Sequence, residues 1–265
     1  MDNRAIGVFD SGYGGLTAVK ALRELMPHEN IIYFGDSARA PYGPRPAEQL
    51  KVMAKQDIEL LLEKDVKAIL AACGTVSSNA ADVLESSPVK VIGVLKAGVK
   101  AMSKVCGDGP LAIIATEASI KSGAFEGALR ALCPDREIIP LACPDFVPLI
   151  EGGHYEAEDP LVKAAVEKDL QPLKDKNCAA LLLGCTHFGL IGEAIKEFLG
   201  ETELISASVS AAEEMREYLV ENGLCGEHEA LCCLSSGDTA DFNRNAALFL
   251  GNSEVQAEKT AVMEV

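Results

Sequence analysis

The sequence lacks any apolar run long enough to form a membrane-spanning helix. Crossing a bilayer takes about 20 consecutive apolar residues, and no run in this chain of 265 residues reaches that length. The first residues, Met1 to Arg4, are polar and have the character of neither a signal peptide nor a transit peptide. We therefore expect a cytoplasmic protein with no membrane partner.

Positive charge is also scarce. The chain has 24 Lys and Arg against 40 Asp and Glu, which gives a net charge of −16. Such a surface repels phosphate backbones, so nucleic acid is not an expected partner. Hydrophobic residues make up 48% and charged residues 24%, a balance typical of a folded globular chain. The length suits one large α/β domain or two smaller ones.

Motifs for common cofactors are missing as well. The nine cysteines include no Cys-x-x-Cys pair, which argues against zinc ribbons and thioredoxin-like redox pairs. The glycine-rich stretch after Asp10 is not Gly-x-Gly-x-x-Gly, and no Gly-Lys-Ser/Thr occurs anywhere, so a nucleotide site is not favoured. We therefore expect activity without metal, nucleotide or other cofactor.

The chain does contain nine short apolar runs that alternate with helical patterns. The runs are nearly continuous in apolar residues, as in strands covered by helices on both faces. The clearest helical pattern covers Pro46 to Lys64. Alternation of strand and helix predicts parallel sheets. The candidate strands are Ala5–Phe9, Asn30–Phe34, Ala68–Ala72, Lys90–Val94, Leu111–Ala115, Glu137–Leu141, Ala179–Leu183, Glu203–Ile205 and Ala230–Leu234.

Segments of the first half match segments of the second half in the same order. Apolar strands align easily by chance, but an ordered series of matches favours an internal duplication. The sequence therefore predicts an α/β fold of two similar domains, each a parallel-sheet α/β sandwich, related by a pseudo-twofold duplication. The matched pairs are Ala5–Asp10 with Leu111–Thr116, Asn30–Asp36 with Glu137–Cys143, Ala71–Thr75 with Leu183–His187, and Val91–Val94 with Leu204–Ala207.

Two cysteines occupy matching places at strand ends, where open parallel sheets bind ligands. Cys73 and Cys185 each follow a buried strand and lead into a predicted helix. The positive end of a helix lowers the pKa of a thiol, so we expect both thiols to be reactive. Two thiols facing across a cleft can remove and return a proton on opposite faces of one carbon. Formation of a disulfide between them stays open as an alternative.

Other polar residues follow the same strand ends. Asp10 precedes the glycine-rich loop Ser11–Thr17, whose backbone N–H groups can bind a carboxylate. The Asp10 side chain can bind an ammonium group, orient a thiol or serve only as a turn residue. The loop Asp36–Gly43 can fold over the strand ends with its own N–H groups free.

Two residues are candidates to assist the second thiol. His187 lies two positions after Cys185 and can tune that thiol. Cys-x-His is also a fragment of a metal site, but the further ligands that a metal requires are not evident. Glu151 can act as an acid near the second thiol, or it is simply a solvated loop carboxylate.

Together these motifs resemble those of the glutamate racemases, which are amino-acid racemases without a cofactor. The resemblance implies two α/β domains with the active site between them. The first domain comprises residues 1–95 and 209–265, and the second comprises residues 96–208. The resemblance also implies a homodimer that supplies D-glutamate for peptidoglycan. The motifs that carry it are Gly7–Gly12, Gly14–Thr17, Tyr33–Arg39, Pro41–Gly43, Ala72–Cys73 with Thr75, Cys143–Pro144, Leu149–Gly152 and Leu183–His187.

The resemblance also implies roles for single residues. Cys73 would act on D-glutamate and Cys185 on L-glutamate. Asp10 would assist the first thiol, and His187 with Glu151 the second. The residues that would line the substrate site are Ser11, Pro41, Tyr42, Gly43, Gly74, Thr75, Thr116, Ser119 and Thr186.

One position departs from the pattern of the family. Gly74 stands where these racemases usually have Asn, so an amide that would contact the substrate is missing. We expect Gly74→Asn to raise kcat/KM for glutamate, unless the site has re-formed around glycine. Two other functions stay open: racemisation of aspartate or another amino acid, and binding of an acidic metabolite by a weakly active relative.

Overall fold

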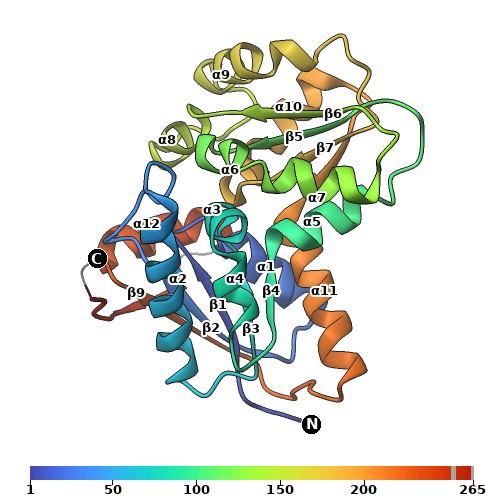
Figure 1. The fold of residues 1–265 in the computed structure, drawn as a ribbon. Helices are drawn as coiled ribbons and strands as arrows, with labels where there is room; N and C mark the ends of the chain where they lie inside the picture. Colours follow the sequence, from blue (N-terminus) through green and yellow to red (C-terminus); the bar gives the residue numbers. More distant parts are fainter. Residues whose placement is uncertain (252–254, 264–265) are drawn as a thin grey trace.

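A computed structural model of the chain describes residues 1–251 and 255–263, and it contains two parallel sheets (Figure 1). Sheet A has the strand order β10-β9-β2-β1-β3-β4, and sheet B has the order β6-β5-β7-β8. The strands of sheet A are β1 (Ile6–Asp10), β2 (Asn30–Gly35), β3 (Ala68–Ala71), β4 (Val91–Gly93), β9 (Ala230–Ser235) and β10 (Ala257–Lys259). Those of sheet B are β5 (Leu111–Ala115), β6 (Ile138–Ala142), β7 (Ala180–Leu183) and β8 (Glu203–Ser206).

The two sheets repeat one topology. The order β2-β1-β3-β4 in sheet A is the order β6-β5-β7-β8 in sheet B, strand for matching strand. Every pairing between these strands is parallel. The nine predicted strands and the predicted fold class of two similar parallel-sheet halves are confirmed.

The C-terminal tail adds a strand that the sequence pattern does not predict. Ala257–Lys259 forms β10 and pairs with β9. A strand of three residues with one apolar side chain leaves no periodic signal, so pairing with a neighbour decides its structure. Residues 252–254 and 264–265 lie outside the described residues.

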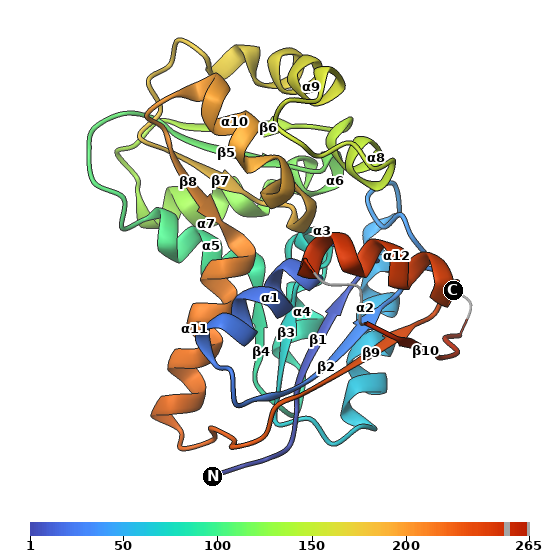
Figure 2. The same cartoon turned by 180° about the vertical axis from the view of Figure 1, so that it is seen from behind.

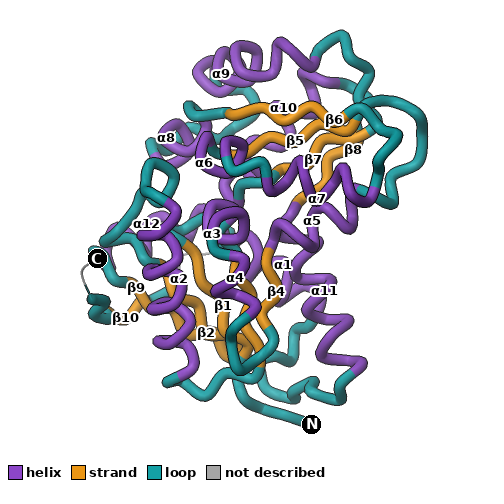
Figure 3. The backbone as a smooth tube through the Cα atoms, viewed as in Figure 1, coloured by secondary structure: helices purple, strands orange, loops and turns teal. Residues whose placement is uncertain are grey.

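Helices cover both faces of sheet A, as the tube trace also shows (Figure 3). Helices α2 and α4 cover one face (Figure 1), and α1, α11 and α12 cover the other (Figure 2). The α-helices in chain order are α1 (Leu16–Leu25), α2 (Ala47–Leu62), α3 (Gly74–Asn79), α4 (Ala81–Glu85), α5 (Val94–Met102), α6 (Glu117–Lys121), α7 (Ala124–Leu132), α8 (Phe146–Glu151), α9 (Pro160–Leu170), α10 (Gly192–Leu199), α11 (Ala207–Glu221) and α12 (Thr239–Leu250). Two short 3₁₀ helices are η1 (Gln171–Leu173) and η2 (Thr186–Ile191).

The predicted helix over Pro46 to Lys64 is confirmed as α2, with Pro46 as its N-cap residue. Its apolar positions, Leu50, Met53 and Ile58, are buried against sheet A. Across the described parts of the chain, no helix has both the length and the apolar character that a bilayer crossing requires.

A buried ion pair ties together the amino ends of strands in sheet A. Lys67 Nζ lies 2.5 Å from Glu29 Oε2, and their side chains are 0% and 3% exposed. The ammonium group also donates to the Asp2 carbonyl at 2.8 Å, and the Gly226 N–H donates to Glu29 Oε1 at 2.8 Å. The pair therefore connects β2 and β3 with the N-terminal residues and the segment before β9.

Lys67→Met is expected to lower the free energy of unfolding by about 3–5 kcal/mol, because it leaves Glu29 buried without its cation. Urea unfolding monitored by circular dichroism measures the loss. The double variant Lys67→Met, Glu29→Gln is the control and should recover part of the stability, since it removes the unpaired charge. A single variant as stable as the parent would contradict the assignment.

Candidate active site

The carboxyl ends of β3 and β7 meet where sheet A faces sheet B. A Cβ placed on Gly74 would lie 2.2 Å from the carbonyl oxygen of Gly184. Such a distance is far inside van der Waals contact, so only glycine fits at position 74 with the backbones in this arrangement. Cys73 directly precedes Gly74, and Cys185 directly follows Gly184. The two predicted thiols therefore lie on opposite sides of this close contact, the Gly74–Gly184 junction.

The first thiol is buried beside Ser11. Cys73 is 4% exposed and serves as the N-cap of α3, and its Sγ lies 3.7 Å from Ser11 Oγ. The expectation of a lowered pKa is wrong for this cysteine. Burial raises the pKa of the Cys73 thiol to about 12, and the nearby charge of Asp10 acts in the same direction. Helix α3 has only six residues, and its positive end does not outweigh these two effects.

Asp10 ends β1 next to this thiol. It is 1% exposed, and its Oδ2 accepts a hydrogen bond from the Gly15 N–H at 3.0 Å. Its Oδ1 is buried and has no hydrogen-bond partner among the described residues. Burial raises the pKa of Asp10, although the charge of His187 opposes the shift. A buried acceptor without a partner costs about 1–3 kcal/mol, which is the kind of cost found at functional sites.

The second thiol belongs to a chain of three polar side chains. Cys185 Sγ lies 3.9 Å from His187 Nδ1, and His187 Nε2 lies 3.1 Å from Glu151 Oε1. His187 is 5% exposed, whereas the Glu151 side chain is 40% exposed. Burial lowers the pKa of His187, but the interactions with Cys185 and Glu151 raise it more, to about 10. The imidazole is therefore a cation at neutral pH, placed beside a half-buried thiol.

The glycine-rich loop after β1 packs directly on this second thiol motif. A Cβ on Gly14 would lie 2.4 Å from both His187 Nδ1 and Thr186 Oγ1. The Phe249 ring of α12 also meets the imidazole edge to face, with ring centroids 5.5 Å apart. Phe249 was not predicted as a site residue, because its contact with His187 joins segments far apart in the chain.

A hydroxyl network crosses between α3 and α6. Thr75 Oγ1 lies 3.2 Å from Thr116 Oγ1, and Thr116 Oγ1 lies 3.0 Å from Ser119 Oγ. Ser78, which was not predicted as a site residue, donates to the Gly74 carbonyl at 2.8 Å, and its Oγ also lies 3.2 Å from Ser119 Oγ. The structure thus brings three of the predicted substrate residues together near the Gly74–Gly184 junction.

The loop after β2 is only partly open to the site. Pro41 is exposed and Gly43 is half-buried, but Tyr42 is only 2% exposed. The Tyr42 hydroxyl contacts the carboxyl groups of Asp36 and Asp57 inside the protein. Any contact of this loop with a ligand therefore involves Pro41, Gly43 or backbone groups rather than the Tyr42 hydroxyl.

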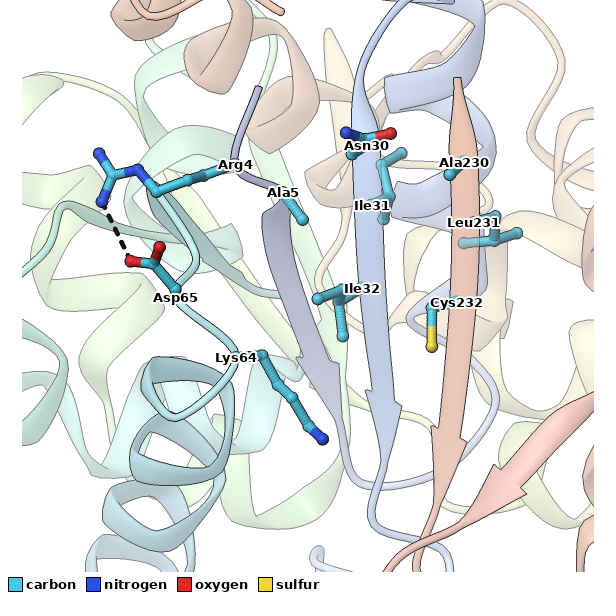
Figure 4. Close-up of a pocket in the computed structure, with 10 residues that line it drawn as sticks. All are labelled: Arg4, Ala5, Asn30, Ile31, Ile32, Lys64, Asp65, Ala230, Leu231 and Cys232. Atoms are coloured by element: carbon cyan, nitrogen blue, oxygen red, sulfur yellow. Dashed lines mark hydrogen bonds and ion pairs between the residues drawn. The ribbon is translucent and has the colours of Figure 1, made fainter. Parts of the chain in front are cut away.

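A cavity of about 400 Å³ lies at the other end of sheet A, and it contains none of the predicted site residues (Figure 4). In the described residues, no three His, Cys, Asp or Glu side chains are arranged to hold a metal ion. The residues that line the cavity are Arg4, Ala5, Asn30, Ile31, Ile32, Lys64, Asp65, Ala230, Leu231 and Cys232.

The structure gives a steric argument against the expectation that Gly74→Asn raises kcat/KM. An asparagine there would place its Cβ inside the Gly184 carbonyl oxygen, so the missing amide cannot be restored without separating the two strand ends. The φ angle of Gly74 is not among the positive ones, so the obstacle is the neighbouring backbone and not conformational strain. The site is built around glycine at this position.

Comparison with known proteins gives consistent matches over most of the chain. The Asp/Glu/hydantoin racemase family matches residues 17–215. The glutamate racemase of Thermoanaerobacter pseudethanolicus is 37% identical over 95% of both chains, and that of Streptococcus sanguinis is 41% identical over 81% of both. The crystal structure of the Francisella tularensis glutamate racemase in complex with D-glutamate superimposes with a TM-score of 0.90 at 35% identity, covering 98% of each chain.

Glu151→Gln is expected to lower the pKa of His187 from about 10, because it removes one of the interactions that raise it. NMR titration of the imidazole Cε1–H resonances measures the change, and the other three histidines serve as internal controls. An unchanged titration of His187 would show that Glu151 does not hold the imidazolium.

The raised pKa of His187 also determines how the stability of the fold depends on pH. The folded-state pKa of about 10 lies above the ordinary value near 6.5, so the charged interaction stabilises the fold fully below pH 6.5 or so. This stabilisation is lost as the pH rises through about 10. In Glu151→Gln the loss should be complete at a lower pH.

Proposed function

The chain belongs to the Asp/Glu/hydantoin racemase family, and we propose that it interconverts L-glutamate and D-glutamate by transferring the α-proton between two thiols. As a racemase it is an isomerase. The observation that carries the two-thiol proposal is the Gly74–Gly184 junction, which brings Cys73 and Cys185 together with separate polar partners.

The two thiols have opposite surroundings, and these suit opposite roles. Cys73 is buried with a pKa of about 12, so at neutral pH it holds its proton. Cys185 lies beside the His187 cation, with its Sγ 3.9 Å from the imidazole Nδ1. In the proposed resting enzyme, Cys185 is the base and Cys73 is the acid, which is the state that receives L-glutamate.

The proposed reaction balances without any other reagent. The Cys185 thiolate takes the α-proton of L-glutamate, so an S–H bond forms as the Cα–H bond breaks. The electron pair stays on the α-carbon, and the Cys73 thiol gives its proton to the opposite face. D-glutamate leaves an enzyme in which Cys73 is the thiolate and Cys185 the thiol, which is the state for the reverse reaction. We propose that no metal, nucleotide or other cofactor takes part.

The groups next to each thiol are consistent with these different roles of Cys73 and Cys185. Asp10, with its unpartnered Oδ1, is proposed to assist Cys73, and His187 with Glu151 to assist Cys185. Substrate binding is proposed to use hydroxyl and backbone groups around the junction. These groups belong to Ser11, Pro41, Tyr42, Gly43, Gly74, Thr75, Thr116, Ser119 and Thr186.

We also propose a cellular location, an oligomeric state and a division into domains. The relatives described above are named as glutamate racemases, and D-glutamate is a building block of peptidoglycan. We propose that the chain works in the cytoplasm as a homodimer and supplies that D-glutamate. We also propose that residues 1–95 with 209–265 form the domain of Cys73, and residues 96–208 the domain of Cys185. Sheet A and sheet B lie within these two proposed domains, respectively.

Cys73→Ala and Cys185→Ala are each expected to abolish racemisation, because each face of the α-carbon needs its own proton carrier. Circular dichroism detection of L-glutamate and D-glutamate, in buffer without added cofactor, measures the activity in both directions. Cys106→Ala is the matched control, since that cysteine is exposed and lies outside the site. Near-normal racemisation by either of the first two variants would refute the two-thiol assignment.

Gly74→Asn is expected to lower kcat/KM for glutamate, because its Cβ must displace the Gly184 carbonyl and with it Cys185. A displacement near 1 Å costs about a hundredfold in rate. Kinetics on both enantiomers of glutamate and of aspartate measure the loss and any change of substrate. Gly127→Ala is the control, because nothing lies within 4 Å of its Cβ position. A correctly folded Gly74→Asn enzyme with equal or higher kcat/KM would show that catalysis does not use this close junction.

A further inference from the structure

Beneath the loop after β2 lies a buried polar cluster that the proposed chemistry does not explain. Asp36 and Asp57 are both 0% exposed, Tyr42 is 2% exposed and Arg39 is 8% exposed. Asp57 belongs to α2, while the other three belong to the loop. Two carboxylates and one guanidinium in such a place are costly unless the charges and hydrogen bonds balance.

The Tyr42 hydroxyl has two carboxyl neighbours in this cluster and too few hydrogens to donate to both. The Tyr42 hydroxyl contacts Asp36 Oδ2 and also lies 3.1 Å from Asp57 Oδ2, but it has only one hydrogen to donate. If both carboxyl groups were ionised, one of these contacts would join two oxygen lone pairs. One of the two carboxyl groups must therefore donate a hydrogen of its own.

The remaining hydrogen bonds show which carboxyl group it is. Both oxygens of Asp36 accept from other donors: Oδ1 from Ser236 Oγ at 2.7 Å, and Oδ2 from Arg39 Nε. Asp57 Oδ1 accepts from Arg39 Nη2 at 2.8 Å, but among the described residues Asp57 Oδ2 meets only the Tyr42 hydroxyl. The hydrogen therefore belongs on Asp57 Oδ2, which donates to Tyr42, and Tyr42 in turn donates to Asp36.

The charges agree with this arrangement. With Asp57 neutral, Asp36 and Arg39 form a balanced buried pair, whereas two ionised carboxyl groups would leave one buried negative charge uncompensated. Burial raises the pKa of Asp57 well above its ordinary range, and the charges of Asp36 and of Asp10 at the end of β1 add to the shift. The positive charge of Arg39 opposes it.

The same cluster connects the loop to other elements of the fold. Arg39 also donates to the Gln56 side chain of α2 and, at 3.2 Å, to the Met263 carbonyl of the C-terminal tail. The Arg45 guanidinium donates to the Arg39 carbonyl at 2.6 Å and 3.0 Å. Pro41 and Gly43 lie between Arg39 and Arg45 in the chain, so the path of this part of the loop depends on the hydrogen bonds of these two arginines.

We propose that Asp57 is a positioning residue that carries a proton in the folded enzyme and, through Tyr42 and Arg39, holds the loop Asp36–Arg45 in place over the substrate site. The effect on substrate rests on the proposed function. The proton itself does not, because it can be measured by folding stability alone.

The first test compares the unfolding of the wild type and Asp57→Asn by denaturant from pH 5 to pH 7. The native wild type keeps the proton, and the unfolded chain, with an ordinary Asp pKa near 3.9, has lost it. The wild-type unfolding constant, relative to that of the variant, should therefore rise about tenfold per pH unit until the pH reaches the folded-state pKa. Asparagine carries no titrating proton, and the other groups cancel in the ratio. A ratio that does not change with pH would overturn the proposal.

The second test uses steady-state kinetics with glutamate. Asp57→Asn keeps one acceptor for Arg39 and one donor for Tyr42, so its KM should stay within about twofold of the wild type. Asp57→Leu has a similar volume but neither group, and its KM should rise about tenfold with kcat changed much less. If Asp57→Leu does not fold, Tyr42→Phe interrupts the same relay and should raise KM in the same way.

The outcomes separate the two proposals. An Asp57→Asn enzyme as impaired as Asp57→Leu would show that the site needs a charged carboxylate, and a normal KM in both would show that Asp57 does not position the loop. If the wild type does not racemise glutamate at all, the proposed function fails, while the pH dependence of unfolding still decides where the proton is.

Discussion

The close approach of the backbones at Gly74 and Gly184 is the constraint on which the rest of the site depends. The Gly184 carbonyl occupies space that any side chain at position 74 would need. Each glycine adjoins one of the two cysteines, so the contact sets how far apart the two thiols lie. The hydroxyl contact between Thr75 and Thr116 at 3.2 Å crosses the same junction and depends on the same spacing.

Around this junction the duplicated fold supplies two unlike environments. Cys73 is buried beside a carboxylate, and Cys185 is half-buried beside an imidazolium. In a symmetric pair of thiols, each thiol would hold its proton equally well. The unlike partners assign the proton to Cys73 at rest, while the similar backbone on both sides keeps the two sulfurs at matching strand ends.

Much of the fold could be predicted from the sequence, because buried parallel strands are short and almost wholly apolar. The positions of nine strands, and with them the strand ends that carry Cys73 and Cys185, follow from that pattern. The direction of the Cys73 pKa shift could not be predicted, because it depends on burial by distant segments. Strand β10, the Gly74–Gly184 contact and the protonated Asp57 also arise from contacts between segments far apart in the sequence, which leave no local signal.

The central claim is that two separate groups handle the proton on the two faces of the α-carbon. Racemisation of L-glutamate in D₂O, stopped after a few per cent of conversion, tests it most directly. With two thiols, the D-glutamate formed carries deuterium at the α-carbon, because its proton comes from a group equilibrated with solvent, while the remaining L-glutamate carries none. Early D-glutamate that retains the original hydrogen, or deuterium that enters both enantiomers equally from the start, would show a single base and contradict the account.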